Sequence, residues 1–364
     1  MQYRRLGRSR VELSTVSCGA MQFARADVTQ DIVTALLDRA VTLGVNFIET
    51  GPRYGDSEEK IGAALAELRL RDRVALSTKA SVKVAPDADA LKHAVERSLR
   101  RMRTDHLEIY HLWFVNTWEE FETLTGAGGT LDAIRRLRDE GVIDHIGISS
   151  HARTEEIIRM IETGWFDSVT IYHNAFMTKD RAVLDVAERL DLGVIAMGPL
   201  NGGLLGSDSE KLSFLRTDAE ASNAQAALRW LLSDPRVTTA IVGFDSVEHV
   251  EDAAAVSDME PMSRQKLAEI AETFETLRRD VEATCTSCGY CKPCPQNVDI
   301  PAILRALSRY RVLGTLDHER QQYARMTGGR ADLCTHCGEC IDKCPQHLPI
   351  PGLLELAEQV LASD

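Results

Sequence analysis

Short apolar runs alternate with longer segments of helical period along most of the chain, after an opening that predicts a hairpin from residues 1–7 and 10–13. The runs predicted to be strands are Thr15–Cys18, Val45–Ile48, Val74–Ser77, Leu107–Leu112, Ile143–Ile148, Ser168–Ile171, Gly193–Met197 and Thr239–Val242. The predicted helices are 29–43, 57–68, 89–102, 130–140, 154–162, 180–189, 222–232, 247–256 and 263–283. Eight strands that are each followed by a helix predict a (β/α)8 TIM barrel, of the α/β class.

A doubly wound sheet is the alternative arrangement for alternating strands and helices. It would place a G-x-G-x-x-G turn after its first strand. The chain reads C-G-A-M-Q-F-A at that position, which does not offer such a phosphate-binding loop. We therefore expect the barrel, in which the chemistry lies at the carboxyl ends of the strands.

Side chains suited to acid–base chemistry occur at the carboxyl ends of three successive predicted strands. Glu49 and Tyr54 follow the second strand, Lys79 follows the third, and His111 and Trp113 lie at the end of the fourth. Because alternate residues of a strand face the same side, His111 and Trp113 are expected to point towards one pocket. Each residue alone has an ordinary structural interpretation, but their joint placement at one rim predicts an active site.

A tyrosine needs a charged neighbour to exchange a proton readily at neutral pH. The pKa of a free phenol is about 10, and a nearby ammonium group stabilises the phenolate and lowers that pKa. Lys79 would supply the ammonium, and Glu49 would hold Lys79 in place. Tyr54 is therefore the predicted general acid for a carbonyl, or the general base for an alcohol.

Two cysteine runs near the end of the chain are almost copies of each other. The first reads C-T-S-C-G-Y-C-K-P-C-P from residue 285, and the second reads C-T-H-C-G-E-C-I-D-K-C-P from residue 334. Each run places three thiols two residues apart and adds a fourth before a proline. The eight predicted metal ligands are Cys285, Cys288, Cys291, Cys294, Cys334, Cys337, Cys340 and Cys344.

This spacing is that of two-cluster bacterial ferredoxins, in which the fourth cysteine of each run ligates the other cluster. On that precedent one 4Fe-4S cluster takes Cys285, Cys288, Cys291 and Cys344, and the other takes Cys334, Cys337, Cys340 and Cys294. The first run is one residue shorter before its last cysteine, a difference that a loop can absorb. Structural zinc is the alternative, because it also takes four thiolates, usually from two separated C-x-x-C pairs. Two triads that each close with Cys-Pro favour iron–sulfur.

The length of 364 residues exceeds the usual size of one domain. We expect a barrel over residues 1–283 and a ferredoxin-like domain over residues 284–364. The second domain should be mainly helical, because an apolar stretch of helical period follows each Cys-Pro, at residues 302–313 and 352–361. Of nine cysteines only Cys18 lies outside this domain, and it is expected to be a buried apolar side chain.

Charge and the first residues restrict the partners. A net charge of −13 disfavours a general nucleic-acid surface, which needs clustered Lys and Arg. The opening M-Q-Y-R-R-L-G-R-S-R lacks the apolar core of a secretory signal, and no apolar run approaches the roughly 20 residues that span a bilayer. We therefore expect a cytoplasmic protein without a membrane partner, in a compartment where thiols stay reduced.

Several motifs over residues 1–283 resemble those of the aldo-keto reductase superfamily. They are the opening Y-R-R-L-G, E-T-G-P-R-Y-G-D-S-E beside the family pattern D-T-A-x-x-Y-G-x-S-E, S-T-K, I-G-I-S-S, I-A-M-G-P-L-N-G-G-L-L and A-L-R-W-L-L. With its cysteine-rich tail, the chain resembles the branch that carries a C-terminal ferredoxin-type domain. The resemblance implies hydride transfer between a nicotinamide cofactor, NAD(P), and a carbonyl or alcohol, sugar-like substrates included.

The resemblance also implies roles for individual residues. Tyr54 would be the proton donor and Lys79 the partner that lowers its pKa. The implied cofactor-binding residues are Ser149 and Ser150 for the nicotinamide amide, Gly202 and Gly203 for the pyrophosphate, and Ser246 in the segment that takes the adenosine end.

Three departures from the family pattern modify these expectations. Glu49 replaces the family aspartate and is one methylene longer, which still allows a pair with Lys79. The histidine usual on the fourth strand falls at Trp113, while His111 lies two residues earlier. The segment after the eighth strand has no Arg or Lys to grip a 2′-phosphate, and Asp245 would repel one, so we expect NAD in preference to NADP.

Hydride transfer moves two electrons, whereas one cluster accepts one, and no motif indicates a flavin between them. Two hypotheses follow. In the first, the barrel is an oxidoreductase that acts on a small molecule while the clusters exchange electrons with an external electron carrier. In the second, which Trp113 suggests, the barrel has lost efficient reductase chemistry and the chain is an electron-transfer or assembly protein.

Overall fold

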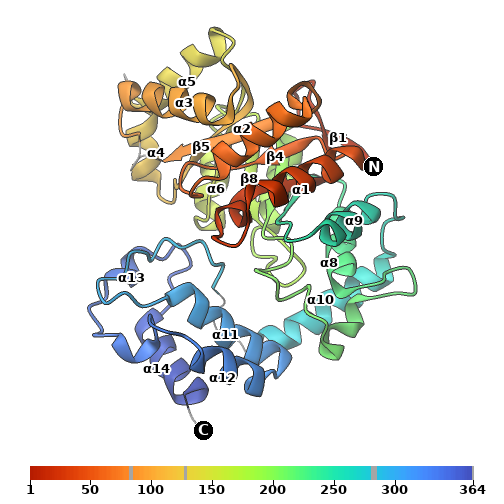
Figure 1. Ribbon diagram of the computed structural model, residues 1–364, viewed down its shortest axis with the longest axis vertical. Helices are drawn as coiled ribbons and strands as arrows, with labels where there is room; N and C mark the ends of the chain where they lie inside the picture. Colours follow the sequence, from red (N-terminus) through yellow and green to blue (C-terminus); the bar gives the residue numbers. More distant parts are fainter. Residues whose placement is uncertain (82–84, 127–128, 280–284, 363–364) are drawn as a thin grey trace. The chain divides into compact units, whose positions relative to one another are not determined.

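The computed structural model describes residues 1–81, 85–126, 129–279 and 285–362 (Figure 1). The expected domain boundary between residues 283 and 284 lies within 280–284, outside the described residues, so its position stays a prediction.

Contacts between residues divide the chain into two compact units. The first unit holds Met1–Pro199 and Ala224–Met262, and the second holds Leu200–Asn223 and Ser263–Asp364. One loop of the barrel sequence, Leu200–Asn223, is therefore grouped with the cysteine-rich tail.

The first unit contains a closed barrel of parallel strands in the order β10-β3-β4-β5-β6-β7-β8-β9. Its strands are β3 (Val16–Gly19), β4 (Phe47–Glu49), β5 (Ala75–Ser81), β6 (Leu107–Trp113), β7 (Ile143–Ser149), β8 (Ser168–Tyr172), β9 (Gly193–Met197) and β10 (Val237–Val242). All eight predicted strands are confirmed, with ends that move by a few residues. Most of them are buried along their whole length, as is typical of parallel strands that are covered on both faces.

Helices follow these strands and lie outside the barrel (Figure 1). They are α1 (Gln30–Thr42), α2 (Ser57–Leu68), α3 (Ala88–Met102), α4 (Trp118–Thr125), α5 (Thr130–Asp139), α6 (Thr154–Ile161), α7 (Arg181–Arg189), α8 (Asn223–Leu232) and α9 (Val247–Val256). Side-chain caps fix several starts: Thr29 accepts a hydrogen bond from Ile32 N, and Asp87 accepts one from Ala90 N. Helix α4, which Thr117 caps in the same way, was not predicted.

The predicted N-terminal hairpin is confirmed and closes the amino-terminal end of the barrel. Its strands β1 (Tyr3–Arg5) and β2 (Glu12–Ser14) pair antiparallel. Leu6 and Leu13 from this hairpin are fully buried in one apolar cluster with Phe47 and Ile195 from the barrel strands. The opposite, carboxyl end of the barrel therefore remains as the place for chemistry.

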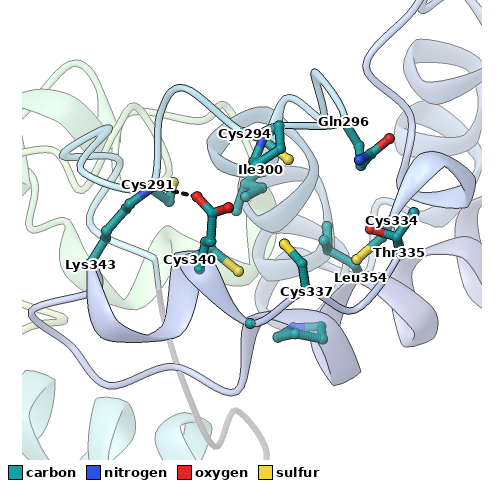
Figure 2. Close-up of a pocket in the computed structure, with 14 residues that line it drawn as sticks. Cys291, Cys294, Gln296, Ile300, Cys334, Thr335, Cys337, Cys340, Lys343 and Leu354 are labelled. Atoms are coloured by element: carbon teal, nitrogen blue, oxygen red, sulfur yellow. Dashed lines mark hydrogen bonds and ion pairs between the residues drawn. The ribbon is translucent and has the colours of Figure 1, made fainter.

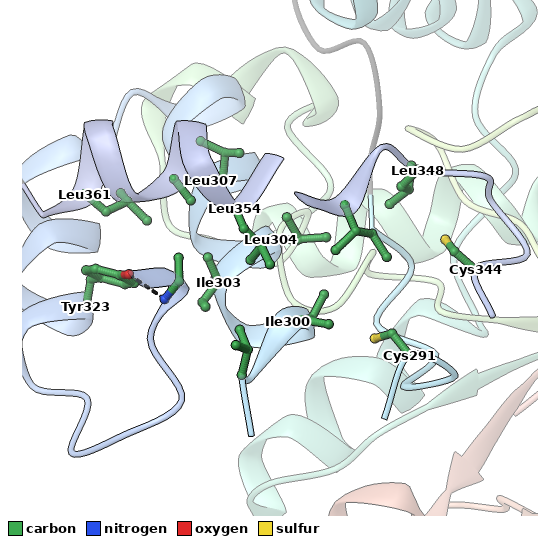
Figure 3. Packing of buried hydrophobic residues seen from close by; sticks show 14 residues of the cluster. Cys291, Ile300, Ile303, Leu304, Leu307, Tyr323, Cys344, Leu348, Leu354 and Leu361 are labelled. Carbon is green, nitrogen blue, oxygen red and sulfur yellow. Dashed lines mark hydrogen bonds between the residues drawn. The ribbon is translucent and has the colours of Figure 1, made fainter. Parts of the chain in front are cut away.

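The second unit is mainly helical, as expected. Its helices are α10 (Arg264–Arg279), α11 (Ile300–Leu313), α12 (Leu316–Ala324), α13 (Glu339–Asp342) and α14 (Ile350–Leu361). The two apolar helices expected after the Cys-Pro pairs correspond to α11 and α14. Their apolar faces form one buried cluster, and Figure 3 shows Cys291 and Cys344 near each other at one end of it.

The loop Leu200–Asn223 packs within the second unit. Phe214 of this loop meets Phe274 of α10 edge to face, with 5.0 Å between ring centroids. Gly202 lies close to Arg305 of α11, since a Cβ there would stand 3.5 Å from Arg305 Cδ. Across the part of the chain that the structure describes, no helix combines the length and the apolar character that crossing a bilayer requires.

Candidate functional site

Three predicted catalytic residues meet at the carboxyl end of the barrel. The Nζ atom of Lys79, in β5, donates a hydrogen bond to Tyr54 Oη at 2.7 Å. The same ammonium group forms an ion pair with Glu49, the last residue of β4. Both members of this ion pair are buried, and burial makes a pair of opposite charges in contact hard to separate.

A tight turn after β4 places the tyrosine. Tyr54 N donates to Gly51 O at 2.9 Å, and Ser57 N, at the start of α2, donates to Tyr54 O at 2.9 Å. The hydroxyls of Thr50 and Ser57 hydrogen-bond to each other at 2.7 Å and close the turn. Gly51 has to be small, because a Cβ there would stand 2.7 Å from Lys79 Cε.

The electrostatics of the phenol differ from the expectation. Burial and the Glu49 carboxylate raise the pKa of Tyr54, and the ammonium of Lys79 only partly opposes them. The prediction of a lowered Tyr54 pKa is therefore wrong for the protein by itself, although Lys79 acts in the predicted direction. Burial works against the charge of Lys79, but Glu49 and Tyr54 outweigh it, so the pKa of Lys79 is raised. The resting state is a neutral phenol beside an ammonium ion.

His111 lies inside the barrel with both ring nitrogens engaged. Ser77 Oγ lies 2.9 Å from its Nδ1, and Thr170 Oγ1 lies 3.2 Å from its Nε2. Burial, assisted by the charge of Lys79, lowers the pKa of His111 to about 3. The imidazole is therefore neutral at physiological pH, and these two hydroxyl groups fix its orientation.

Trp113, the last residue of β6, stands closer to the charged groups at the mouth. Lys79 Nζ lies 5.4 Å from the centre of its ring, and Arg53 Cζ lies 5.9 Å from it. A cation at this distance from an indole face is attracted to the ring. Trp113, on the fourth barrel strand, occupies the position that carries a histidine in the family pattern, and it presents an aromatic surface there. The nearby His111 is hydrogen-bonded to two hydroxyl groups instead.

The predicted cofactor-binding residues of the first unit lie where the strands end. Ser149 ends β7 and pairs in register with Trp113. The Ser150 hydroxyl already has two hydrogen-bond partners close by in the chain fold: it donates to Val115 O at 2.6 Å and accepts from Ala152 N at 3.1 Å. Ser246 caps α9 by accepting a hydrogen bond from His249 N.

Gly202 and Gly203 lie in the second unit, in the loop that follows β9. Both have a positive φ, 65° and 90°, which glycine adopts without strain. A Cβ on Gly203 would have no atom within 4 Å, so the backbone faces open space there. That opening suits the close approach of a phosphate group to main-chain N–H groups.

Two residues of the mouth were not identified from the sequence. His151 follows β7 and is buried, and burial together with the charges of Lys179 and Lys79 lowers its pKa to about 3. The signal was visible in the segment I-S-S-H, directly after a strand. Arg25 Nη1 donates to Asp245 Oδ1 at 2.8 Å, so a basic group does reach the segment after β10, from a residue 220 positions away in sequence.

The cysteines of the second unit surround two neighbouring cavities. The first cavity is lined by four cysteines and by apolar side chains such as Ile300, Leu304 and Leu348. Its cysteines are Cys285, Cys288, Cys291 and Cys344. These are the four residues predicted for one cluster.

The second cavity is lined by Cys294, Cys334, Cys337 and Cys340, and also by Cys291 of the first set (Figure 2). The shorter first run does not prevent Cys294 from reaching the second triad. The geometry thus groups the cysteines as the predicted pairing does. Cys291 and Ile300 line both cavities, so the two cavities are adjacent.

The donor set fits iron–sulfur clusters. Burial raises the pKa of Cys285 to about 11 and, with neighbouring thiolates, that of Cys291 to about 12, so these thiols need a metal to lose their protons. The Ser287 hydroxyl is buried beside the first set and has no hydrogen-bond partner among the described residues. A cluster sulfur would be a suitable acceptor for it. All nine cysteines are free.

Within the described residues, no three His, Cys, Asp or Glu side chains are close enough to enclose a single metal ion. A cube of four irons and four sulfides is wider than one ion, and the thiolates that hold it stand further apart.

Comparisons with known proteins agree with this division. Residues 15–275 match the model of the aldo/keto reductase family, and residues 284–348 match that of the 4Fe-4S dicluster domain. An uncharacterized oxidoreductase of Bacillus subtilis, YrpG, is 27% identical over 69% of this chain and 90% of its own length. L-galactose dehydrogenase of Arabidopsis thaliana is 26% identical over 76% of this chain and 96% of its own.

Solved structures show the same fold. An aldo/keto reductase of Klebsiella pneumoniae in complex with NADP and acetate has a TM-score of 0.64 and 26% identity, over 75% of this chain and 95% of that one. The holo form of aldo-keto reductase AKR11C1 from Bacillus halodurans has a TM-score of 0.63 and 24% identity, over 75% and 96%. The matched families, the barrel and the two cysteine sets lead to one conclusion: this chain belongs to the aldo/keto reductase family, as an oxidoreductase that also carries a 4Fe-4S dicluster domain.

Proposed function

We propose that the barrel mouth transfers hydride between a nicotinamide cofactor and a small carbonyl or alcohol, with Tyr54 as the proton donor or acceptor. The observation that carries this proposal is the chain of contacts from Tyr54 through Lys79 to Glu49. When bound, the nicotinamide supplies or accepts the hydride. The protein's own part is to hold a proton at Tyr54 Oη and to orient the carbonyl oxygen towards it.

The charges at the mouth suit the reduction direction. A phenol with a raised pKa keeps its proton at neutral pH and can donate it to the oxygen of a carbonyl as that oxygen gains negative charge. Lys79 then stabilises the phenolate that remains, at a distance of 2.7 Å. Glu49 keeps the Lys79 ammonium in place throughout, because separating a buried ion pair costs free energy.

Trp113 would take part as a surface and not as a proton carrier. Its ring is buried next to Lys79 and offers a flat apolar face on which a ring of the substrate or cofactor can stack. His111 would have a structural role and would not transfer a proton, since its two hydroxyl partners hold a neutral imidazole in the barrel interior. The proposed catalytic set is therefore Tyr54, Lys79 and Glu49.

The substrate class that we propose is a polyhydroxylated, sugar-like carbonyl or alcohol compound. Two of the relatives are named for activity on such compounds, namely L-galactose dehydrogenase and the L-glyceraldehyde 3-phosphate reductase of Escherichia coli K12, which is 26% identical over 74% of this chain and 91% of its own length. The charged and polar groups of the mouth can hydrogen-bond to hydroxyl groups of a sugar.

We propose NAD in preference to NADP as the cofactor. Arg25 is a basic group beside Asp245, but it pairs with two carboxylates, Asp245 and Asp27. One guanidinium between two carboxylates leaves a net negative charge, which repels a 2′-phosphate. The NADP complex of the Klebsiella pneumoniae protein shows that the family also accepts the phosphorylated form.

For the second unit we propose two 4Fe-4S clusters, held by the two cysteine sets that line the two cavities, with exchange of single electrons with an external carrier. The free thiols suit the reducing cytoplasm that we propose as its location. If these clusters coexist with a mouth that transfers two electrons as hydride, electrons would enter and leave one at a time at the second unit.

The test is turnover by the anaerobically purified, iron-loaded protein with NADH and a panel of aldoses, in the native chain and in the variant Tyr54→Phe. We expect Tyr54→Phe to lower kcat about 1,000-fold. Tyr110→Phe is the matched control, because Tyr110 is also a fully buried tyrosine but, by alternation along β6, lies on the opposite face of the strand from His111 and Trp113.

A second function has its own support in Trp113 and in the engaged nitrogens of His111, which leave the mouth without the family's strand-four histidine. In that case the chain is an electron-transfer or assembly protein. Clusters that can be reduced, in a protein that neither binds nicotinamide nor turns over any aldose, would establish this second function and reject the first.

A further inference from the structure

The two cysteine sets differ in their exposure. Cys291 and Cys344 of the first set are each only 8% exposed and belong to the apolar core of the second unit. Cys337 of the second set is exposed, and it is the only one of the eight predicted ligands in that class. Gly338, next to it, has no atom within 4 Å of the place where a Cβ would be, so the backbone beside Cys337 is open to solvent.

Two large apolar side chains stand exposed at the ends of the second triad. Leu333 precedes Cys334 and is 45% exposed, and Ile341 follows Cys340 and is 41% exposed. Few large apolar residues of this chain are exposed to that extent in its described part, and two of them directly flank cluster ligands. Exposed apolar side chains in a group mark contact surfaces more often than chance placement does.

The charges around this triad are mainly acidic. Asp332, Glu339 and Asp342 are exposed. The one lysine within residues 332–343 is Lys343, which is half-buried, and its Nζ lies 3.1 Å from Glu339 Oε2. A segment that exposes apolar and acidic side chains together is complementary to a surface that exposes apolar and basic side chains.

We infer that residues 332–342 form a docking port where a basic, one-electron carrier protein meets the exposed second cluster; this inference rests on the two-cluster function proposed above. In each encounter one electron would pass between the carrier and the second cluster, so that one is oxidised as the other is reduced, and no bond or proton moves. Cys291 lines both cavities, so a first cluster would lie beside the second and would be able to exchange that electron with it. Encounters of this kind use small interfaces, so a few exposed residues suffice.

Cytochrome c, a basic one-electron carrier, is the probe for the test. The iron-loaded full chain is reduced anaerobically, the reductant is removed, and reduction of ferricytochrome c is followed by stopped flow at several ionic strengths. The port variants are Leu333→Gln with Ile341→Gln, and Asp332→Asn with Asp342→Asn. Helix α1 offers matched controls, since Ile32 is 38% exposed and lies between exposed Asp31 and Asp38: Ile32→Gln, and Asp31→Asn with Asp38→Asn.

We expect both port variants to lower the second-order rate constant about tenfold at low salt, and the charge variant to flatten its dependence on ionic strength as well. Control variants should keep the native rate. Iron content and the EPR signals of the reduced clusters establish that each variant is loaded. Binding is measured separately, as quenching of the fluorescence of zinc-substituted cytochrome c, and it should weaken in the port variants alone.

Equal rates and equal binding in port and control variants, with both clusters loaded, would overturn the port and leave the two-cluster function intact. A purified protein without iron or sulfide would instead reject the two-cluster function itself, and the port with it. The two failures are therefore distinguishable in one set of samples.

Discussion

The barrel mouth and the cysteine unit both serve redox chemistry, but they hold their reactive groups in opposite ways. At the mouth the groups hold one another: Tyr54, Lys79 and Glu49 are joined by a hydrogen bond and a buried ion pair. In the cysteine unit the thiols face cavities, and burial is the largest cause of the raised pKa of Cys285 and Cys291, with neighbouring thiolates adding to it. The mouth is therefore organised by the fold, whereas the cysteine unit is organised by the inorganic centre that it receives.

The largest effect should come from withholding iron. Cys291 and Cys344 are part of the apolar core between α11 and α14, so iron–sulfur clusters bound to them would hold that core together. Structural metal sites contribute on the order of 10 kcal/mol to small domains. We expect amide hydrogen exchange over 285–362 to speed up by several orders of magnitude, while peptides from β5 and β6 keep their protection. Equal protection of residues 285–362 from hydrogen exchange in iron-free and iron-loaded protein would show that iron does not organise the cysteine unit.

Changing Lys79 should affect only the mouth. In the variant Lys79→Met, Tyr54 loses the cation that stabilises its phenolate, and we expect kcat for carbonyl reduction to fall about 100-fold. Because this change leaves Glu49 buried without a partner, the double variant Lys79→Met with Glu49→Gln is needed to keep the fold. The EPR signals of the clusters should be unchanged in both variants, and a change in them would show that the two regions are not independent.

A smaller effect is expected at the segment after β10. Asp245→Asn removes one of the two carboxylates that pair with Arg25, so the guanidinium becomes available to a 2′-phosphate. We expect the ratio of kcat/KM for NADPH to that for NADH to rise about tenfold, which corresponds to about 1.4 kcal/mol. A ratio that does not move would place the determinant of cofactor choice away from Arg25.

The smallest effect concerns pH. The neutral phenol donates the proton in carbonyl reduction, and burial and Glu49 raise the pKa of Tyr54 above its usual value of about 10. The rate of reduction should therefore stay level from about pH 6 to 9 and fall only above about pH 10. Oxidation of an alcohol needs the phenolate and should become faster as pH rises. A fall in the reduction rate centred near pH 7 would mean that another group is the proton donor.

Much of the fold and of the mouth could be predicted, because the signals were local and periodic. Each barrel strand is a short apolar run, and parallel strands buried on both faces show this pattern clearly. Glu49, Tyr54 and Lys79 could be expected to meet, because the carboxyl ends of parallel strands share one rim. The cysteine pairing could be proposed from spacing alone, and the two cavities group the cysteines in the same way.

The parts that were missed depend on weak or distant signals. Helix α4 has eight residues, three of them glutamate, and helix α12 is largely polar, so neither shows a long apolar period. Arg25 reaches Asp245 across 220 residues, a contact that no local pattern reveals. The predicted direction of the Tyr54 pKa shift was wrong, because burial contributes most to that shift and the extent of burial depends on the folded structure.

The loop Leu200–Asn223 affects whether the barrel can be produced without the rest of the chain. Its side chains pack against α10 and lie near α11, yet its two ends belong to β9 and α8 of the barrel. A shortened gene that stops after the barrel would leave this loop without its neighbours, so recombinant expression of the barrel alone should yield a chain with a frayed segment.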